Sequence, residues 1–343
     1  MMESLSSEIA IDLGTANVLV YMKNRGVILN EPSVIAMISD KGSMKPYAFG
    51  YDAKMMLGRT PQNIKVIRPL KDGVIADFKA SEEMLKYFIK KASKNKLLLR
   101  NSKIIVCVPS CSTPVERRAI QEAAENSGSN DVFLIEEPMA AAIGAGLPVT
   151  DPVGSMIVDL GGGTTEVAVL SLGGVVYSNS VRIGGDKMDD AIIAYIRRHF
   201  NLFIGYQTAE NIKKTIGSAY VNDESSVKKM NIRGRDLILG IPKEIELTEK
   251  QIAESLKDSI SQIIEAIKIA LEAVPPELAS DIVSRGIYMT GGGSMISNLD
   301  YVIGDAVKLP VILSKNPLES VALGTGKVLD NFKLLSQVLF KQE

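Results

Sequence analysis

Two short turns, each opening with Asp-Leu-Gly, carry the residues best suited to chemistry. Residues 12–17 read Asp-Leu-Gly-Thr-Ala-Asn, and residues 159–165 read Asp-Leu-Gly-Gly-Gly-Thr-Thr. Small residues let backbone N–H groups approach an anion closely, and a nest of such groups binds phosphate. A carboxylate at the strand end can hold Mg²⁺ through water, because this ion keeps several waters beside one or two carboxylates. Taken together, the turns predict a clamp for a polyphosphate and its metal, and the alternative for each is an ordinary hairpin turn.

A third glycine cluster lies much later in the chain. Residues 288–294 read Tyr-Met-Thr-Gly-Gly-Gly-Ser, after an apolar run and before a predicted helix. Glycine turns at helix starts favour phosphate or a close approach of a nucleotide. None of the three clusters matches the P-loop, which ends in Gly-Lys-Ser/Thr, or the dinucleotide fingerprint. The pattern therefore indicates a nucleotide fold of another kind.

The elements around these turns alternate between strand and helix, as in α/β folds. Both Asp-Leu-Gly turns join two apolar strands, at 9–20 and 156–169, so the chain contains a weak internal repeat and two related lobes are predicted. Thr113 with Glu116 and Thr248 with Gln251 form capping-box patterns that predict helix starts. Asp186 is predicted to cap a further helix. The apolar stripes on these helices are interpreted as core.

The amino-acid composition argues against several classes of function. The 343 residues are 46% hydrophobic and carry a net charge of −1, so a general attraction to nucleic acid is not indicated. Two cysteines, Cys107 and Cys111, and the single His199 do not suggest a disulfide scaffold or a zinc site. No apolar run reaches the roughly 20 residues of a membrane span, and the polar start does not read as a signal peptide. A reducing, cytosolic protein is the simplest interpretation.

The order of the three turns resembles the superfamily of actin, heat-shock chaperones and sugar kinases. Four further segments resemble MreB and its close relative Mbl, and the resemblance runs over nearly the whole chain. These segments are Asn-Glu-Pro-Ser-Val at 30–34, Arg-Pro-Leu-Lys-Asp-Gly-Val-Ile-Ala-Asp at 68–77, Glu-Glu-Pro-Met-Ala-Ala-Ala-Ile-Gly-Ala-Gly at 136–146 and Val-Ala-Leu-Gly-Thr-Gly at 321–326.

The resemblance implies a two-lobed, actin-like α/β ATPase fold. Each lobe would be an α/β core subdomain that carries a smaller inserted one. The implied bounds are 1–35, 68–148 and 319–343 for subdomain IA, 36–67 for IB, 149–186 and 251–318 for IIA, and 187–250 for IIB. ATP or ADP with Mg²⁺ would bind between the lobes.

The resemblance also assigns site residues. Asp12 and Asp159 would hold the metal through water. The two turns would bind the phosphates through Gly14, Thr15, Ala16, Asn17, Gly161, Gly162, Gly163 and Thr164. The adenosine would meet Glu210, Lys213, Gly291, Gly292, Gly293 and Ser294.

The implied catalytic residues are Glu137, Thr164 and Asp159, with Glu137 positioning the water that attacks the γ-phosphate. Glu136 is the rival for that role. Neighbouring residues at a helix start point about 100° apart, so only one of the two can face the cleft. For both glutamates the alternative is stabilisation of a helix N-terminus by carboxylates.

The function implied by the resemblance is that of a bacterial cytoskeletal protein involved in cell shape. It would polymerise, as antiparallel double protofilaments, and hydrolyse ATP slowly. Attachment to an anionic membrane surface would use the Leu97–Leu99 triplet between Lys96 and Arg100. Proteins of shape control or wall synthesis are possible partners, and the location would be cytoplasmic and peripheral to the membrane. A small-metabolite kinase and a chaperone ATPase are the rival functions.

Overall fold

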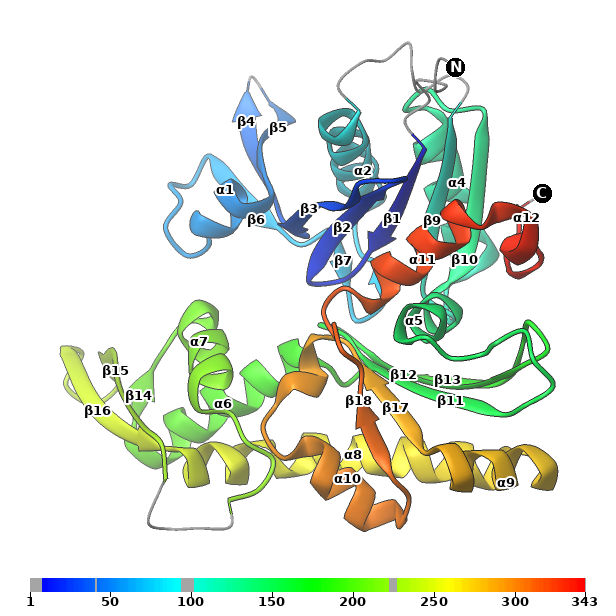
Figure 1. Cartoon of the computed structure of the whole chain (residues 1–343). Helices are drawn as coiled ribbons and strands as arrows, with labels where there is room; N and C mark the ends of the chain where they lie inside the picture. Colours follow the sequence, from blue (N-terminus) through cyan, green and yellow to red (C-terminus); the bar gives the residue numbers. More distant parts are fainter. Residues whose placement is uncertain (1–7, 41, 94–101, 222–226, 343) are drawn as a thin grey trace.

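The computed structural model describes residues 8–40, 42–93, 102–221 and 227–342. It has two lobes, one above the other in Figure 1. Each lobe contains one five-stranded mixed sheet and one three-stranded antiparallel sheet. The five-stranded sheets hold the two Asp-Leu-Gly turns, and the smaller sheets lie together at one end of the molecule.

The large sheet of lobe I has the order β10-β9-β1-β2-β3. β1 and β2 form an antiparallel hairpin, whereas β1, β9 and β10 run parallel. Their carboxyl ends therefore share one edge, which is where open α/β sheets bind ligands. The strands are β1 (Ile9–Leu13), β2 (Asn17–Met22), β3 (Gly26–Pro32), β9 (Lys103–Val108) and β10 (Asp131–Glu136).

Lobe II repeats this arrangement, with the order β13-β12-β11-β17-β18. β11 and β12 form the antiparallel hairpin, and β11, β17 and β18 run parallel. The two hairpins predicted from the internal repeat are thus confirmed. The strands are β11 (Ser155–Leu160), β12 (Thr165–Ser171), β13 (Gly174–Val181), β17 (Ile287–Thr290) and β18 (Val311–Leu313).

The small sheets have the orders β5-β4-β6 in lobe I and β14-β15-β16 in lobe II, and a two-stranded ribbon β7-β8 follows the first. Helices α1 and α7 accompany them. The bounds are β4 (Ile35–Asp40), β5 (Ser43–Phe49), α1 (Gly50–Met55), β6 (Ile64–Ile67), β7 (Leu70–Lys71), β8 (Val74–Ile75), β14 (Leu202–Phe203), α7 (Tyr206–Ile216), β15 (Lys229–Asp236) and β16 (Pro242–Thr248).

Further helices cover the large sheets. Among the described residues, no helix combines the length and the apolar composition needed to cross a membrane. The bounds are α2 (Phe78–Ala92), α4 (Pro114–Glu125), α5 (Glu137–Ala145), α6 (Gly185–Phe200), α8 (Glu249–Ala273), α9 (Pro276–Arg285), η2 (Gly292–Met295), α10 (Leu299–Val307), α11 (Ser320–Asp330), α12 (Phe332–Leu335) and η3 (Ser336–Val338).

Helix starts follow local sequence in two predicted cases and depart from it in a third. Both capping boxes are formed, at Thr113 before α4 and at Thr248 before α8, with side chain and backbone bonded reciprocally. The prediction that Asp186 caps a helix is wrong. α6 begins two residues earlier than predicted, at Gly185 after the cap residue Gly184, and Asp186 lies in its first turn. Its carboxylate instead accepts a hydrogen bond from Arg68 of lobe I at 2.7 Å, so a tertiary ion pair replaces the cap.

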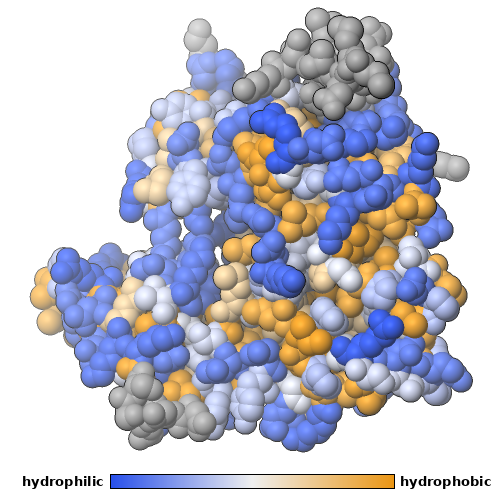
Figure 2. All heavy atoms as spheres, in the orientation of Figure 1, coloured by the Kyte–Doolittle hydropathy of each residue, from blue (hydrophilic) through white to orange (hydrophobic). Residues whose placement is uncertain are grey.

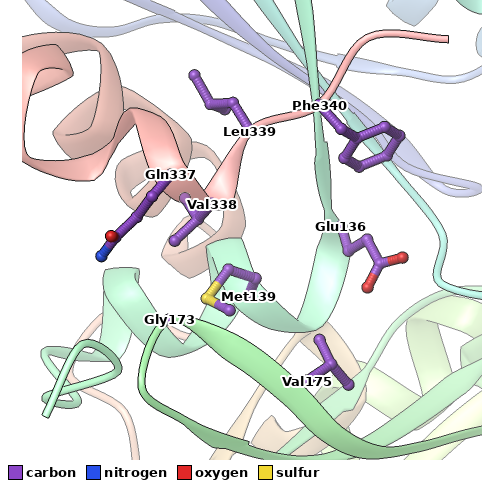
Figure 3. Close-up of a pocket in the computed structure, with 8 residues that line it drawn as sticks. All are labelled: Glu136, Met139, Gly173, Val175, Gln337, Val338, Leu339 and Phe340. Carbon is purple, nitrogen blue, oxygen red and sulfur yellow. The ribbon is translucent and has the colours of Figure 1, made fainter.

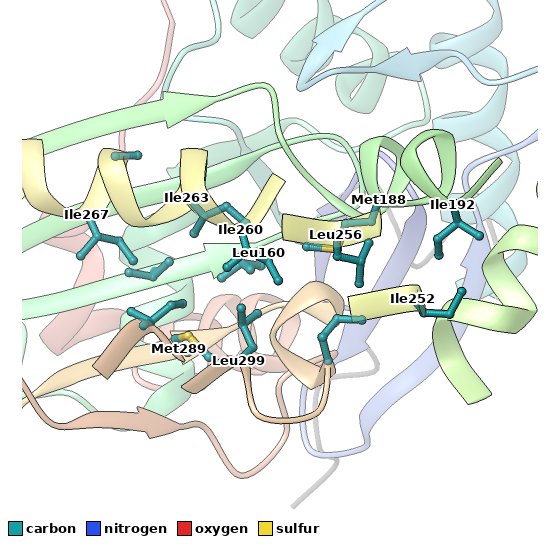
Figure 4. Close-up of a cluster of buried hydrophobic side chains, with 14 of the residues drawn as sticks. Leu160, Met188, Ile192, Ile252, Leu256, Ile260, Ile263, Ile267, Met289 and Leu299 are labelled. Atoms are coloured by element: carbon teal, nitrogen blue, oxygen red, sulfur yellow. The ribbon is translucent and has the colours of Figure 1, made fainter. Parts of the chain in front are cut away.

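Each lobe has its own hydrophobic core, and a third cluster joins them. In lobe II one face of α8 packs on the large sheet through residues spaced by three and four, as predicted (Figure 4). These residues are Ile252, Leu256, Ile260, Ile263 and Ile267. The third cluster contains residues of both lobes together with α5 and α11. These two helices pack so closely that a side chain at Gly144 or Gly324 would overlap the facing backbone, which explains both glycines.

Candidate functional site

The two Asp-Leu-Gly turns face each other across the junction of the lobes. A Cβ atom added at Gly162 would lie 2.5 Å from the Cβ of Ala16, and one at Gly163 would lie 2.8 Å from Cγ2 of Thr15. Only glycine permits this approach, because real Cβ atoms essentially never come within 3.0 Å of another heavy atom. The tertiary structure thus brings together two turns that are about 150 residues apart in sequence.

The start of α6 orients the second turn. The N–H of Gly185 donates to the carbonyl of Gly161 at 3.1 Å, and the N–H of Asp186 donates to the carbonyl of Gly162 at 2.8 Å. In a trans peptide the C=O and the following N–H point in opposite directions. The N–H groups that follow these carbonyls are therefore directed away from α6. Adjacent N–H groups turned outward from a glycine loop are the arrangement that binds phosphate oxygens.

The third glycine turn packs behind the second. Gly291 has a positive φ of 81°, and a side chain there would overlap Leu160 and the carboxylate of Asp159. Ser294 is buried in the short helix η2 and donates to the carbonyl of Gly291 at 2.6 Å, which holds the turn closed. Residues 291–294 therefore border the same site as residues 159–164.

The turn between β7 and β8 closes the site from lobe I. A Cβ at Gly73 would lie 2.6 Å from Cγ2 of Thr164, and one at Gly163 would lie 3.0 Å from the backbone nitrogen of Asp72. Gly73 has a φ of 75°, a conformation that favours glycine. Thr164 is thus buried between this turn and its own hairpin.

Four carboxylates gather around these turns. Asp12, Asp159 and Glu166 are buried, Glu137 is partly buried, and none forms an ion pair with a described Lys or Arg residue. Burial and the charge of Asp159 raise the pKa of Asp12 to about 8, and burial raises the pKa of Asp159 to about 7. Such uncompensated negative charge is costly, so the cluster favours a bound cation.

The carboxylates fit a hydrated magnesium ion better than a directly chelated metal. Asp12 and Asp159 occupy matching places near the ends of the central strands β1 and β11. Within the described residues, no group of three or more His, Cys, Asp or Glu side chains is arranged to chelate an ion. Mg²⁺ needs only one or two carboxylates when phosphate and water complete its shell.

The structure separates the neighbouring glutamates. Glu136 ends β10 and forms an ion pair with Arg117 at 3.1 Å. It lines a cavity of about 270 Å³ with Met139, Val175 and Phe340, which come from both lobes (Figure 3). Glu137 begins α5, and burial followed by the charge of Glu166 raises its pKa well above the usual value. Asp159 and Asp12 contribute to the same rise. Burial, then the charge of Asp159 and to a lesser degree that of Glu136 raise the pKa of Glu166, so both glutamates lie near the carboxylate cluster. They differ in that Glu136 has the Arg117 partner, whereas no described Lys or Arg residue pairs with Glu137.

Two of the predicted adenosine contacts, Lys213 and Glu210, lie in α7. Lys213 donates to the carbonyl of Gly185 at 2.6 Å and forms an ion pair with Asp189 at 2.9 Å, so it supports the start of α6. Glu210 forms ion pairs with Lys54 of lobe I at 2.8 Å and with Lys214 at 2.7 Å. Burial raises the pKa of Glu210, but the hydrogen bonds from Lys214 and Lys54 outweigh it and lower that pKa to about 2.

Three residues at or beside the site were not predicted from the sequence. They are Glu166 in the carboxylate cluster, and Lys54 and Arg68, which form ion pairs between the lobes. A glutamate inside the apolar run 165–170 is unusual, because charged side chains are rarely fully buried, and this signal could have identified Glu166. No comparable signal marks Lys54 or Arg68, whose partners are 156 and 118 residues away. The Leu97–Leu99 triplet predicted to touch membranes lies outside the described residues.

Two lobes of repeated topology, with three glycine turns and paired aspartates between them, define an actin-like fold. The chain is similar to MreB5 of Spiroplasma citri, solved bound to ADP, with a TM-score of 0.89 at 38% identity over 96% of this chain and 98% of that one. It also matches the MamK double helical filament structure, with a TM-score of 0.76, at 21% identity over 94% of this chain and 99% of that chain, which supports the fold alone.

The family follows from sequence comparison. The family model for MreB/Mbl protein matches residues 6–337. The cell shape-determining protein MreB of Escherichia coli (strain K12) is 53% identical over 98% of this chain and 97% of its own length. The cell shape-determining protein Mbl of Bacillus subtilis (strain 168) is 48% identical over 96% of this chain and 97% of its own length. The chain belongs to the MreB/Mbl family, and the resemblance inferred from its motifs is confirmed.

Proposed function

We propose that this protein binds ATP and ADP between its lobes, hydrolyses ATP slowly, and polymerises into filaments that serve cell shape. The observation that carries the nucleotide site is the contact between the two glycine turns, at Gly162 and Ala16, beside four buried or partly buried carboxylates with no described cationic partner. The solved structures of MreB5 from Spiroplasma citri bound to ADP and to AMPPNP support the same ligand class.

Different residues would bind different parts of Mg-ATP. Asp12 and Asp159 would hold Mg²⁺ through its waters, and that ion would neutralise the phosphate charge. The backbone of the two turns would bind the phosphates. The adenosine would lie toward α7 and η2, beside Glu210, Lys213 and residues 291–294.

Hydrolysis would depend on positioning, because phosphoryl transfer to water offers little covalent work to a protein. Glu137 would accept a hydrogen bond from the attacking water, and the hydroxyl of Thr164 would orient it. The buried position of Thr164 beside Gly73 and the place of Glu137 among the cleft carboxylates support these roles.

Filament formation is supported by apolar side chains at opposite ends of lobe II. The β15–β16 turn exposes four apolar residues at one end, and α9 exposes Val283 at the other (Figure 1). The turn residues are Leu237, Ile238, Leu239 and Ile241, and apolar atoms are visible at that end of the surface (Figure 2). Contacts between two different surfaces propagate head to tail, whereas a self-complementary surface closes a dimer.

We further propose that the chain divides into the four subdomains at the bounds given above and that its filaments are antiparallel double protofilaments. We also propose peripheral attachment to an anionic membrane through Leu97–Leu99. The resemblance to the family motivates each of them. Partner proteins of shape control or wall synthesis belong to the same proposal.

Sedimentation tests the central proposal. The protein should pellet with Mg-ATP and stay in the supernatant without nucleotide. Ile238→Asp should stay in the supernatant, because it places a charge on a side chain that is 76% exposed at the predicted contact. Tyr301→Asp, on a side chain that is 61% exposed on α10, is the matched control and should pellet. Failure of the wild-type protein to pellet under any nucleotide condition would overturn filament formation.

A further inference from the structure

Glu166 is a buried carboxylate that no role above requires. It lies on β12 with 1% of its surface exposed, and it is paired in register with Asp159 on β11. Residues directly opposite each other in an antiparallel pair project to the same face of the sheet. Glu166 and the metal-side carboxylate of Asp159 therefore project to one face, and Ser110 of lobe I contacts Glu166 there.

Ser110 is the described hydrogen-bond partner of Glu166. The Ser110 hydroxyl donates at 3.0 Å to one oxygen, and its backbone N–H lies 3.3 and 3.4 Å from the two oxygens. This contact joins the end of β9 in lobe I to β12 in lobe II. A carboxylate can accept about four hydrogen bonds, so the contact holds Glu166 in place and leaves acceptor capacity unused.

The surroundings of Glu166 do not account for it as a structural residue. No described Lys or Arg residue pairs with it, and an uncompensated buried charge destabilises a fold. Glu136 on β10 pairs in register with Val108 on β9, so Glu137 and Ser110 follow adjacent strand ends, and Ser110 contacts Glu166. Among the neighbouring charges, Glu166 also has the largest effect on the pKa of Glu137. The two glutamates therefore lie near one another, with Glu137 contributed by lobe I and Glu166 by lobe II.

We propose that Glu166 is a second catalytic carboxylate for ATP hydrolysis, which orients the attacking water together with Glu137; this role rests on the proposed ATPase activity. Each glutamate would accept one hydrogen bond from the water, directing an oxygen lone pair at the γ-phosphorus. The new P–O bond forms as the bond from the γ-phosphorus to the bridging oxygen breaks. That electron pair leaves with ADP, and the water proton departs with inorganic phosphate or solvent.

This arrangement would couple hydrolysis to lobe closure. One water-orienting glutamate comes from each lobe, and Ser110 holds Glu166 from the opposite lobe. The water would be oriented from both sides only when the lobes are close enough for Ser110 to contact Glu166, as it does here. Separation of the lobes would remove one acceptor and slow hydrolysis, because reaction with water depends on exact placement.

Single-turnover hydrolysis of bound ATP, with the affinity for Mg-ATP measured separately, tests the role. Glu166→Gln keeps the side-chain size and one oxygen for Ser110, so it should fold. We expect its hydrolysis rate to fall on the order of tenfold or more, and its Kd for Mg-ATP to change less than about threefold. Ser110→Ala should slow hydrolysis less, because the backbone N–H still holds Glu166.

A double variant separates catalysis from structure. If both glutamates orient one water, Glu137→Gln with Glu166→Gln should be about as slow as the slower single variant, because groups that act as a unit are non-additive. Two independent structural defects would instead multiply in rate. Glu166→Asp, which keeps the charge but withdraws it by one methylene, should be slow yet as thermally stable as wild type, and it serves if Glu166→Gln does not fold.

The outcomes distinguish this role from the proposed ATPase activity. A wild-type hydrolysis rate in Glu166→Gln, or multiplicative rates in the double variant, would overturn the role and leave the ATPase activity standing. A wild-type protein that binds Mg-ATP without ever hydrolysing it would overturn both.

Discussion

The ammonium group of Lys54 lies 2.8 Å from a carboxylate oxygen of Glu210, and this ion pair joins α1 of lobe I to α7 of lobe II. The side chain of Gln207 strengthens the contact by donating to the backbone carbonyl of Lys54 at 2.8 Å. Because Glu210 is also a proposed adenosine contact, the pair would link closure of the lobes to the nucleotide site. It forms at the end of the molecule where the two small sheets lie.

Loss of this pair should loosen the closed state. Lys54→Met keeps the apolar stem but removes the charge, and a partly exposed ion pair contributes at most about 1 kcal/mol. We expect a fluorescent ATP analogue to dissociate about two- to fivefold faster. Lys214→Met is the matched control, because Lys214 pairs with Glu210 within one helix and does not bridge the lobes. Equal acceleration in both variants would show that the bridge across the lobes is irrelevant.

The adjacent glutamates should respond differently to the same substitution. Glu137→Gln should lower phosphate release on the order of 10²-fold with little change in Kd for Mg-ATP, because it positions water rather than nucleotide. Glu136→Gln should hydrolyse ATP at a near wild-type rate and lose a little thermal stability, since it forfeits the ion pair with Arg117. A slow Glu136→Gln beside a normal Glu137→Gln would reverse the assignment.

The nucleotide-free protein should become less stable as the pH rises from 6 to 8. The pKa of Asp12 is about 8 in the folded chain and about 3.9 in an unfolded one. Between these values the native state holds more protons, so the free energy of unfolding falls with rising pH. Asp12→Asn cannot release that proton, so its melting temperature should fall less over this range. Parallel melting curves for the two proteins would contradict the proposed charge cluster.

The same cluster predicts the effect of metal. Mg-ATP should raise the melting temperature more at pH 8 than at pH 6, because the metal stabilises the ionised carboxylates and binding then releases fewer protons. Mg-ATP should raise the melting temperature of Asp12→Ala far less than that of the wild-type protein. An unchanged calorimetric affinity for Mg-ATP in both Asp12→Ala and Asp159→Ala would remove these residues from the site.

Membrane attachment should require both filaments and the leucine triplet. Insertion of three leucines into lipid would contribute roughly 5 kcal/mol, and nearby lysines about 1 kcal/mol each on anionic lipid, so a monomer would bind weakly. A filament repeats the contact and gains avidity. Filaments should therefore float with anionic liposomes, whereas monomers remain behind. Leu98→Ser should abolish flotation without preventing sedimentation, and Leu98→Val should keep both; floating Leu98→Ser filaments would exclude the triplet.

Features of this protein that depend on local chemistry could be predicted from the sequence. Each Asp-Leu-Gly turn predicts a hairpin because small residues end one strand and an apolar run begins the next. Each capping box predicts a helix start because its hydrogen bonds involve residues three apart. The family and its two-lobed fold could also be predicted, because each of the motifs that indicate them is a continuous run of residues.

Contacts between residues that are far apart in the sequence follow from how the chain packs in three dimensions. Asp186 matched the chemistry of a helix cap, but Arg68 from the other lobe offered a stronger partner. Glu136 and Glu137 are chemically identical, and the difference between them arises because β10 ends and α5 begins at that point, beside Arg117 on one side and the cleft on the other. The position of Glu166 is set by the register between β11 and β12 and by the hydrogen bond from Ser110, which is 56 residues away in sequence. Such partners depend on how the lobes pack, and no spacing along the chain records that.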